Sequence, residues 1–410
     1  MKTCYLIPHF FLTQIIVYFI ISSCFSLQGR AAIRYVDGNA TGRNNGKSWT
    51  DAWTNLMAME GISPGDTIYI SGGPAGSSQT YVLSGALSSL QGFAEGTSGN
   101  NVTYQIGQDP AHNGTAIFKS ANPKSAFVGS VSNVIISGDA GDGAMHFSIN
   151  GFRYLMFCQN VTDLKVSFID CGEMPKFALI NPGNRIELDH CRIKISDMNG
   201  SNAVQCDFKG STWDDSSIHH CTILIPNNGN GYGVDGIAGA GTGFSLHDNE
   251  ITGYVAPYTG GQHQDGWQAL GGSYIKIYNN TFVNIANYPI FGDASYGNFS
   301  NLWIYNNVIL LTDAKIQASN PPQGIAVGPD GGVFRKLKRW PTFSDVVIAN
   351  NLIIDYGRHA AINLQNNRNQ QSVFTDCIVA NNLYVNSGGL GLDPAVESPA
   401  RDHFERNIGI

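Results

Sequence analysis

One short pattern of hydrophobic and polar positions recurs along the chain from about residue 186 onward. Each copy is a run of alternating apolar and polar residues, followed by a polar pair and another apolar residue. The second residue of that pair is called the anchor here, and the seven anchors are Cys191, Cys221, Asn249, Asn280, Asn307, Asn351 and Asn382. Alternation with period two is typical of β-strands with one buried face. The pattern therefore predicts an all-β chain of short strands.

The anchors are 30, 28, 31, 27, 44 and 31 residues apart. Repeats of this length are typical of stacked units in a solenoid rather than of separate domains. We therefore expect a single-domain parallel β-helix over residues 33–410, with residues 33–75 forming the N-terminal cap and first coil. The longest interval predicts an inserted loop at residues 313–345.

Stacking places equivalent residues of successive coils about 4.8 Å apart. The recurrent Asn is then expected to form a buried amide ladder. Cys191 and Cys221 occupy successive anchors and could form a disulfide, but buried reduced thiols are favoured because small inward residues need no oxidation. A short helix over residues 48–59 is expected to cover the open end of the first coil, with an apolar stripe at Trp49, Trp53, Leu56 and Met57.

Composition and charge narrow the partners and the compartment. Only 13% of residues are charged and the formal net charge is −7, so the chain lacks the basic surface that nucleic-acid binding requires. Lys2 and the apolar stretch 10–21 predict a signal peptide at residues 1–26. The apolar stretch is shorter than a typical transmembrane helix. We therefore expect a secreted, periplasmic or cell-surface protein, a monomer with no membrane span after cleavage, and Cys24 offers an alternative lipidation site.

With these motifs, the chain resembles the right-handed parallel β-helix proteins of the pectate-lyase-like superfamily. The resemblance covers most of the mature chain and rests on the Asn-Asn coils, on Arg34-Tyr-Val-Asp-Gly-Asn-Ala-Thr-Gly and on Gly65-Asp-Thr-Ile-Tyr-Ile. It implies a right-handed parallel β-helix and a carbohydrate ligand. It does not imply one reaction, because this fold carries lyases, hydrolases, epimerases and noncatalytic proteins.

Aspartates recur 14 or 15 residues before four successive anchors, at Asp207, Asp235, Asp265 and Asp293. If equivalent positions stack, four carboxylates line one sheet and repel one another unless a cation or a shared proton intervenes. Ca²⁺ suits several carboxylate oxygens, and lyases of the resembled superfamily use it to hold a uronate carboxylate. The predicted cofactor is therefore Ca²⁺ at these four aspartates.

The favoured function is β-elimination of an anionic, uronate-containing polysaccharide. His263 is the favoured base because it lies two residues from Asp265, and Asp265 and Asp235 complete the predicted catalytic set; Lys209, Arg358 and His359 are other candidate bases. The predicted substrate-binding residues combine side chains near the aspartates with a basic cluster in the inserted loop. They are Lys209, Trp267, Gln268, Arg335, Lys336, Lys338 and Arg339.

Two other functions stay open at this level. Carboxylates one or two coils apart would also suit a glycoside hydrolase, since they approach the separations of retaining and inverting enzymes. A noncatalytic surface protein that binds glycans would show the same repeats, with aspartates that bind structural calcium or face solvent. An assay of the products separates the three functions: a lyase forms unsaturated sugars, a hydrolase forms new reducing ends without them, and a noncatalytic protein forms neither.

Overall fold

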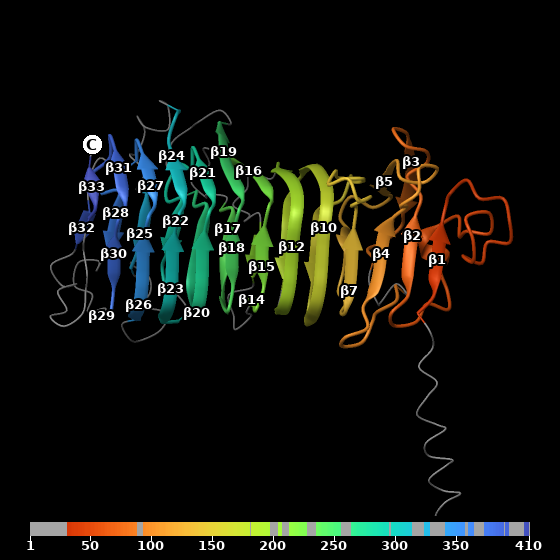
Figure 1. Cartoon of the computed structure of the whole chain (residues 1–410), viewed down its shortest axis with the longest axis horizontal. Coiled ribbons are helices and arrows are strands. Elements are labelled where there is room, and N and C mark those ends of the chain that lie inside the picture. Colours follow the sequence, from red (N-terminus) through yellow and green to blue (C-terminus); the bar gives the residue numbers. More distant parts are fainter. Residues whose placement is uncertain are drawn as a thin grey trace, which may run out of the picture.

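The computed structural model describes residues 31–87, 93–180, 182–196, 204–206, 213–227, 235–255, 264–294, 297–313, 324–328, 341–356, 360–364, 373–388, 390–392 and 406–409. The named strands pair in parallel, and each pairs mainly with the equivalent strand one coil away. The coils stack along one long axis, with the first coils at one end and the last at the other (Figure 1). The predicted right-handed parallel β-helix is confirmed.

Three sheets run along this axis, and β10, β12 and β20 bend to contribute to two of them. The first sheet contains β1 (Ile33–Val36), β2 (Thr67–Ile70), β4 (Val102–Ile106), β7 (Val134–Ser137), β10 (Val161–Met174), β12 (Gly183–Ile195), β14 (Trp213–Asp214), β15 (Ser217–His219), β18 (Ser245–His247), β20 (Trp267–Tyr278), β23 (Phe299–Tyr305), β26 (Thr342–Ala349), β29 (Val373–Thr375) and β30 (Ile378–Ala380). The second adds β3 (Ser78–Leu83), β5 (Thr115–Ser120), β8 (Phe147–Asn150), β16 (Thr222–Asn227), β19 (Glu250–Val255), β21 (Thr281–Val283), β24 (Val308–Leu310), β27 (Leu352–Ile354), β31 (Leu383–Val385) and β33 (Ile408–Gly409). The third adds β6 (Ala126–Val128), β9 (Tyr154–Cys158), β11 (Lys176–Ile180), β13 (Val204–Cys206), β17 (Ile237–Thr242), β22 (Ile290–Gly292), β25 (Ile325–Val327), β28 (Ile362–Leu364) and β32 (Leu390–Leu392).

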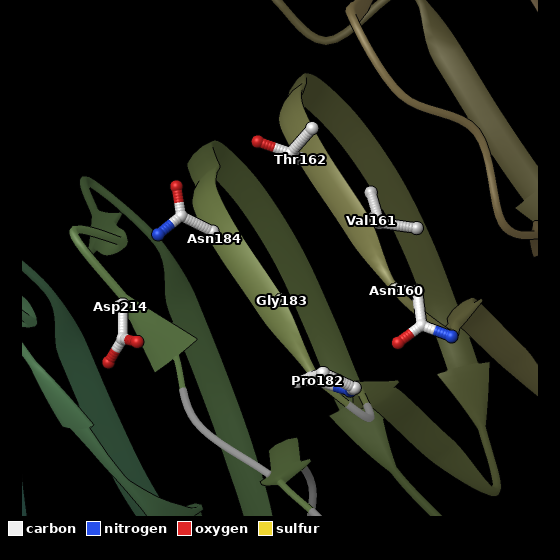
Figure 2. Close-up of a pocket in the computed structure, with 7 residues that line it drawn as sticks. All are labelled: Asn160, Val161, Thr162, Pro182, Gly183, Asn184 and Asp214. Carbon is white, nitrogen blue, oxygen red and sulfur yellow. The ribbon is translucent and has the colours of Figure 1, made fainter.

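An open hollow of about 300 Å³ lies where three successive coils enter the first sheet (Figure 2). It crosses the beginnings of β10, β12 and β14, and it is lined by Asn160, Val161, Thr162, Pro182, Gly183, Asn184 and Asp214. A second hollow of about 260 Å³ is lined by Asn101, Ile135, Asp163, Leu164, Lys165, Arg185 and Glu187. Both therefore lie on the N-terminal half of the first sheet.

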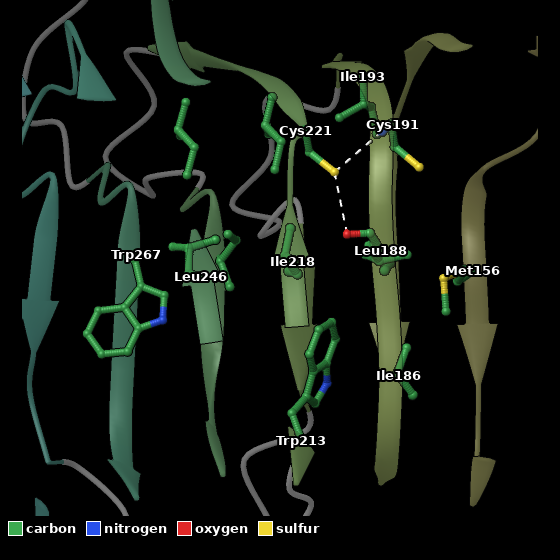
Figure 3. Close-up of a cluster of buried hydrophobic side chains, with 14 of the residues drawn as sticks. Met156, Ile186, Leu188, Cys191, Ile193, Trp213, Ile218, Cys221, Leu246 and Trp267 are labelled. Atoms are coloured by element: carbon green, nitrogen blue, oxygen red, sulfur yellow. Dashed lines mark hydrogen bonds between the residues drawn. The ribbon is translucent and has the colours of Figure 1, made fainter. Parts of the chain in front are cut away.

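The core fills the interior of the coil with the alternate, inward-facing residues of each strand. In β4, Val102, Tyr104 and Ile106 are buried while the intervening residues are partly exposed, as the sequence alternation predicts. Cys191 and Cys221 are buried in this core as reduced thiols, and the Sγ of Cys221 accepts the backbone N–H of Cys191 (Figure 3). The expectation of stacked thiols is confirmed.

The amide ladder is also confirmed. The Oδ1 of Asn307 accepts both the backbone N–H and the side-chain Nδ2–H of Asn280, and Asn351 does the same for Asn307, with distances of 3.0 Å. The residue before each Asn anchor has a left-handed backbone, as at Asn279 and Asn306, with φ of 56° and 57°. Asn and Asp tolerate this region better than most residues, which explains the recurrent Asn-Asn pair.

The expected cap helix is replaced by a three-residue 3-10 turn at Leu56–Ala58. The preceding backbone pairs with β1 instead: the N–H of Trp53 donates to the carbonyl of Tyr35, and the N–H of Asp37 donates to the carbonyl of Trp53. The backbone N–H and carbonyl of Trp53 are therefore not available for the hydrogen bonds of a helix. Trp53 and Leu56 still bury their side chains in the first coil, so the segment covers the core without forming the helix.

The segment 313–345 contains β25, which pairs with β22 and β28 in the third sheet. Part of the expected insertion is therefore a regular rung of the stack. The predicted signal peptide at residues 1–26 lies outside the described residues. Within the described part of the chain, no helix has the length and apolar character needed to cross a bilayer.

Candidate functional site

Asp235 and Asp265 occupy equivalent positions in successive coils, two residues before the first residues of β17 and β20. The backbone N–H of Asp265 donates to Asp235 Oδ1 at 3.0 Å, and Asp265 Oδ1 in turn accepts Tyr288 N–H at 3.0 Å and Asn287 Nδ2–H at 2.8 Å. Both aspartates are buried, and Asp265 is 0% exposed. Burial, together with the charge of Asp235, raises the pKa of Asp265 well above its ordinary value. These acids are buried, and a hydrogen bond between them links successive turns, which corrects the sequence-based expectation of carboxylates on an outer face.

Asp293 does not continue that row. The register places Gly292 opposite Ala269, so Asp293 follows the strand of its coil whereas Asp265 precedes the strand of its own coil. The side chain of Gln268, which is partly exposed, donates to Asp293 Oδ2 at 2.8 Å. The expected row of four carboxylates is therefore wrong at Asp293, whereas Asp235 and Asp265 do occupy equivalent positions in successive coils but are buried. Asp207 lies outside the described residues.

Trp267 is a core residue. Its side chain is 2% exposed and lies among aliphatic side chains inside the coil (Figure 3). It pairs in register with Ile237, which is also buried, so the inward alternation of the strand continues through it. The expectation that Trp267 contacts sugar is therefore wrong. The other predicted site residues lie outside the described residues: His263, Lys209, Arg335, Lys336, Lys338 and Arg339.

A different polar cluster, which the sequence reasoning overlooked, lies on the outer face of the first sheet. Its central row consists of the residues two positions before successive anchors, and the strand register aligns them as Asp189, His219, His247, Tyr278 and Tyr305. The rings of this row stack along the axis with centroids 4.8, 4.7 and 5.0 Å apart. The signal was present in the repeat, because the same two-residue offset from the anchor marks each member.

His219 connects two acids in the cluster. Its Nδ1 lies 3.1 Å from Asp189 Oδ1, and its Nε2 lies 3.1 Å from Glu187 Oε1. Burial opposes the charged form of His219, but the hydrogen bonds to the two carboxylates outweigh it and raise the pKa of His219 to about 9. Lys165 adds a second cation, with its Nζ 2.8 Å from Glu187 Oε1 and 3.2 Å from Asp189 Oδ2.

The hydrogen bonds of the histidines also change the pKa values of Asp189 and Glu187. Burial would raise the pKa of Asp189, but its hydrogen bonds to His219 and His190 lower that pKa well below the ordinary value. The hydrogen bond from His219 is the main reason that the pKa of Glu187 is also lowered, against an opposing contribution from burial. Both carboxyl groups are therefore ionised at neutral pH.

A second row lies beside the first, at the left-handed positions that directly precede the anchors. It contains His190, His220 and Asp248, and Phe168 continues it one coil earlier, directly before Ile169, which pairs with Cys191; φ lies between 50° and 55°. The rings of His190 and His220 stack with centroids 4.6 Å apart, and His190 Nδ1 contacts Asp189 Oδ1. His220 Nδ1 lies 3.5 Å from the same oxygen and 2.9 Å from His219 Nδ1. Three imidazoles thus converge on one carboxylate oxygen.

His247 pairs with an acid of its own. Its Nδ1 lies 2.8 Å from Asp248 Oδ2. Burial would raise the pKa of Asp248, but hydrogen bonds from His247 and Asn279 lower it, so Asp248 is an ionised acceptor. Nδ1 is then the donor to this acid, which leaves Nε2 as the ring nitrogen that can accept a proton.

The cluster also contains the groups that could hold a metal ion. One ligand atom each from Glu187, Asp189 and His219 lie within 4.8 Å of one another, and the same is true of Asp189, His190 and His220. These sets mix imidazole with carboxylate, whereas Ca²⁺ prefers oxygen ligands throughout. The candidate metal centre therefore differs in position and in chemistry from the row of aspartates expected from the sequence.

No known protein-family profile matches the chain, and no curated protein sequence matches it. Among solved structures, it is similar to an alginate lyase from Paenibacillus sp. str. FPU-7, with 17% identity over 83% of this chain and 95% of that one and a TM-score of 0.44. It is also similar to a Family 28 exopolygalacturonase of Yersinia enterocolitica (12% identity, 92% and 78% coverage, TM-score 0.45). A third similar structure is PfbA, a surface adhesin of Streptococcus pneumoniae (12% identity, 80% and 84% coverage, TM-score 0.46). The three names describe a lyase, a hydrolase and an adhesin, so the function must be argued from the site.

Proposed function

We propose that the protein is an exported polysaccharide lyase that cleaves a uronate-containing glycan by β-elimination on the outer face of its first sheet. The observation that carries the proposal is the arrangement of His247, which is bonded to Asp248 through Nδ1 and stacked on Tyr278 of the next coil. This arrangement supplies a proton acceptor beside a proton donor on a partly exposed surface.

The chemistry needs three groups. Nε2 of His247 takes the proton from C5 of the uronate, the C4–C5 double bond forms, and the bond from C4 to the leaving oxygen breaks. Burial is the main reason that the pKa of Tyr278 is raised, so its hydroxyl keeps its proton and can donate it to the leaving oxygen. Lys276 lies on the same strand two residues before Tyr278, exposed, where it can neutralise the uronate carboxylate.

The ionisation of the acids favours elimination over hydrolysis. A glycoside hydrolase with two carboxyl groups needs one of them protonated to act as the general acid. Glu187 and Asp189 both have lowered pKa values and remain ionised, so this pair does not supply such an acid. The basic cluster at Arg335, Lys336, Lys338 and Arg339 stays a prediction for binding remote, anionic sugars.

The test is an assay of the purified mature chain against a panel of uronate polysaccharides, each with and without a chelator. Ultraviolet absorbance from unsaturated sugars is the expected result, and inhibition by chelation that Ca²⁺ reverses would support the predicted Ca²⁺. New reducing ends without absorbance would replace the lyase by a hydrolase. Glycan binding without turnover would identify a noncatalytic surface protein.

A further inference from the structure

We infer that Asp189, His219 and His220 form a binding site for one divalent transition-metal ion of the Zn²⁺ type. The inference goes beyond the proposed lyase activity and does not depend on it. Asp189 Oδ1, His219 Nδ1 and His220 Nδ1 form a triangle with sides of 3.1, 3.5 and 2.9 Å. A tetrahedral Zn²⁺ with bonds of about 2.0–2.1 Å holds its ligand atoms about 3.3 Å apart, so the triangle matches one face of that tetrahedron.

The ring orientations support convergence on a single ion. His219 and His220 are neighbours in sequence, and their ring planes lie 79° apart, so the lone pairs of the two Nδ1 atoms can point to a common position. His190 and His220, in contrast, stack with their planes only 15° apart. Because the rings of His190 and His220 are nearly parallel, their nitrogen lone pairs do not point to a common position. His190 is therefore assigned as a positioning residue, which contacts Asp189, and not as a ligand.

The surroundings of the triangle resemble those that orient metal ligands. The second ring nitrogen of His219, Nε2, faces Glu187 Oε1 at 3.1 Å. A metal-bound histidine usually donates its second ring N–H to a carboxylate in this way. Lys165 contacts Glu187 and the other oxygen of Asp189, and so holds both acids in place.

The site is open on one side. The side chain of Asp189 is 9% exposed, whereas that of His220 is 46% exposed, so the triangle has a buried base and a rim that faces solvent. Three protein ligands with an open fourth position are the arrangement of a zinc site that can accept an external oxygen ligand. Two imidazoles and one carboxylate suit Zn²⁺ better than Ca²⁺.

The experiment uses the full mature chain, freed of metal with a chelator and then titrated with Co²⁺ and with Zn²⁺. We expect the visible absorption of four-coordinate Co²⁺, one ion per chain, and displacement of Co²⁺ by Zn²⁺ but not by Ca²⁺. His219→Ala and His220→Ala should each weaken binding more than 100-fold, and Glu187→Gln should weaken it by about 10- to 100-fold.

The matched control is His146→Gln, because His146 also pairs with an acid, Asp142, but lies away from the cluster. This variant should bind the metal like the unmodified chain, and circular dichroism checks that every variant is folded. Absence of the Co²⁺ band, or binding that persists in folded His219→Ala and His220→Ala, would overturn the inference. Metal binding by a chain without lyase activity would leave this inference intact while removing the proposed function.

Discussion

His219 and His247 stack face to face in adjacent coils, with ring centroids 4.8 Å apart and ring planes within 3° of each other, yet they bond to different acids. His219 uses both ring nitrogens, one toward Asp189 and one toward Glu187. His247 bonds to Asp248 through Nδ1. Two identical side chains at equivalent positions therefore have different chemistry, and only His247 is left with Nε2 as a proton acceptor in this arrangement.

Replacing that acceptor tests the proposed reaction. His247→Gln should lower kcat by roughly 10²- to 10⁴-fold, the usual contribution of a positioned general base, with a small change in KM. Initial rates measured from product absorbance check this. His146→Gln is again the control and should keep full activity, so equal losses in both variants would indicate a structural effect, and an active His247→Gln would exclude His247 as the base.

Asp265→Asn tests the buried pair at the start of the third sheet. Because the folded state raises the pKa of Asp265, it binds a proton that the unfolded chain releases, and this contribution to stability falls as pH rises above about 4. The amide oxygen of Asn can still accept the N–H groups of Tyr288 and Asn287. We expect the free energy of unfolding, measured by denaturant titration between pH 4 and 8, to depend less on pH in the variant.

The same variant tests the sequence-based assignment of Asp265 to catalysis. Since the side chain is fully buried, Asp265→Asn should retain the turnover of the unmodified chain. A large loss of kcat in a variant of normal stability would restore Asp265 to the mechanism.

The amide ladder should contribute more to stability at its centre than at its end. Asn307 donates to the carbonyls of Ile277 and Tyr305 and accepts from Asn280, all in a buried environment. Asn307→Ala leaves several of these groups unpaired and should lower the free energy of unfolding by about 2–4 kcal/mol. Asn407→Ala, at the partly buried end of the ladder, should cost less; equal or reversed effects would contradict this account.

The buried thiols make a prediction about chemical labelling. Burial raises the pKa of Cys158 to about 12, and Cys171, Cys191 and Cys221 are likewise buried. A thiol reagent applied to the native chain should leave these four unmodified, and denaturant should expose all of them, as read by peptide mass spectrometry. Recovery of a peptide with Cys191 linked to Cys221 from the native chain would contradict the reduced state.

The repeat was enough to predict the fold because its signals are local. Period-two alternation specifies strands, and spacings near 30 residues bring successive anchors into axial contact. The amide ladder and the stacked thiols follow directly from the anchors, and both are confirmed. The prediction of a cap helix was wrong because the backbone of Trp53 pairs with β1. The local apolar stripe does not reveal this long-range pairing.

Whether the position of a site residue could be predicted from the sequence depends likewise on its distance from the anchor. Asp189, His219 and His247 lie two residues before their anchors within the same sheet, so their alignment was already encoded in the repeat. Asp265 and Asp293 lie 15 and 14 residues before theirs, on the far side of a turn whose length changes between coils. Strand pairing sets the register between coils, and a count along the chain loses that register once it crosses such a turn. The burial of these acids, and the meeting of His219 and His220 with Asp189, could therefore be settled only by the folded coils.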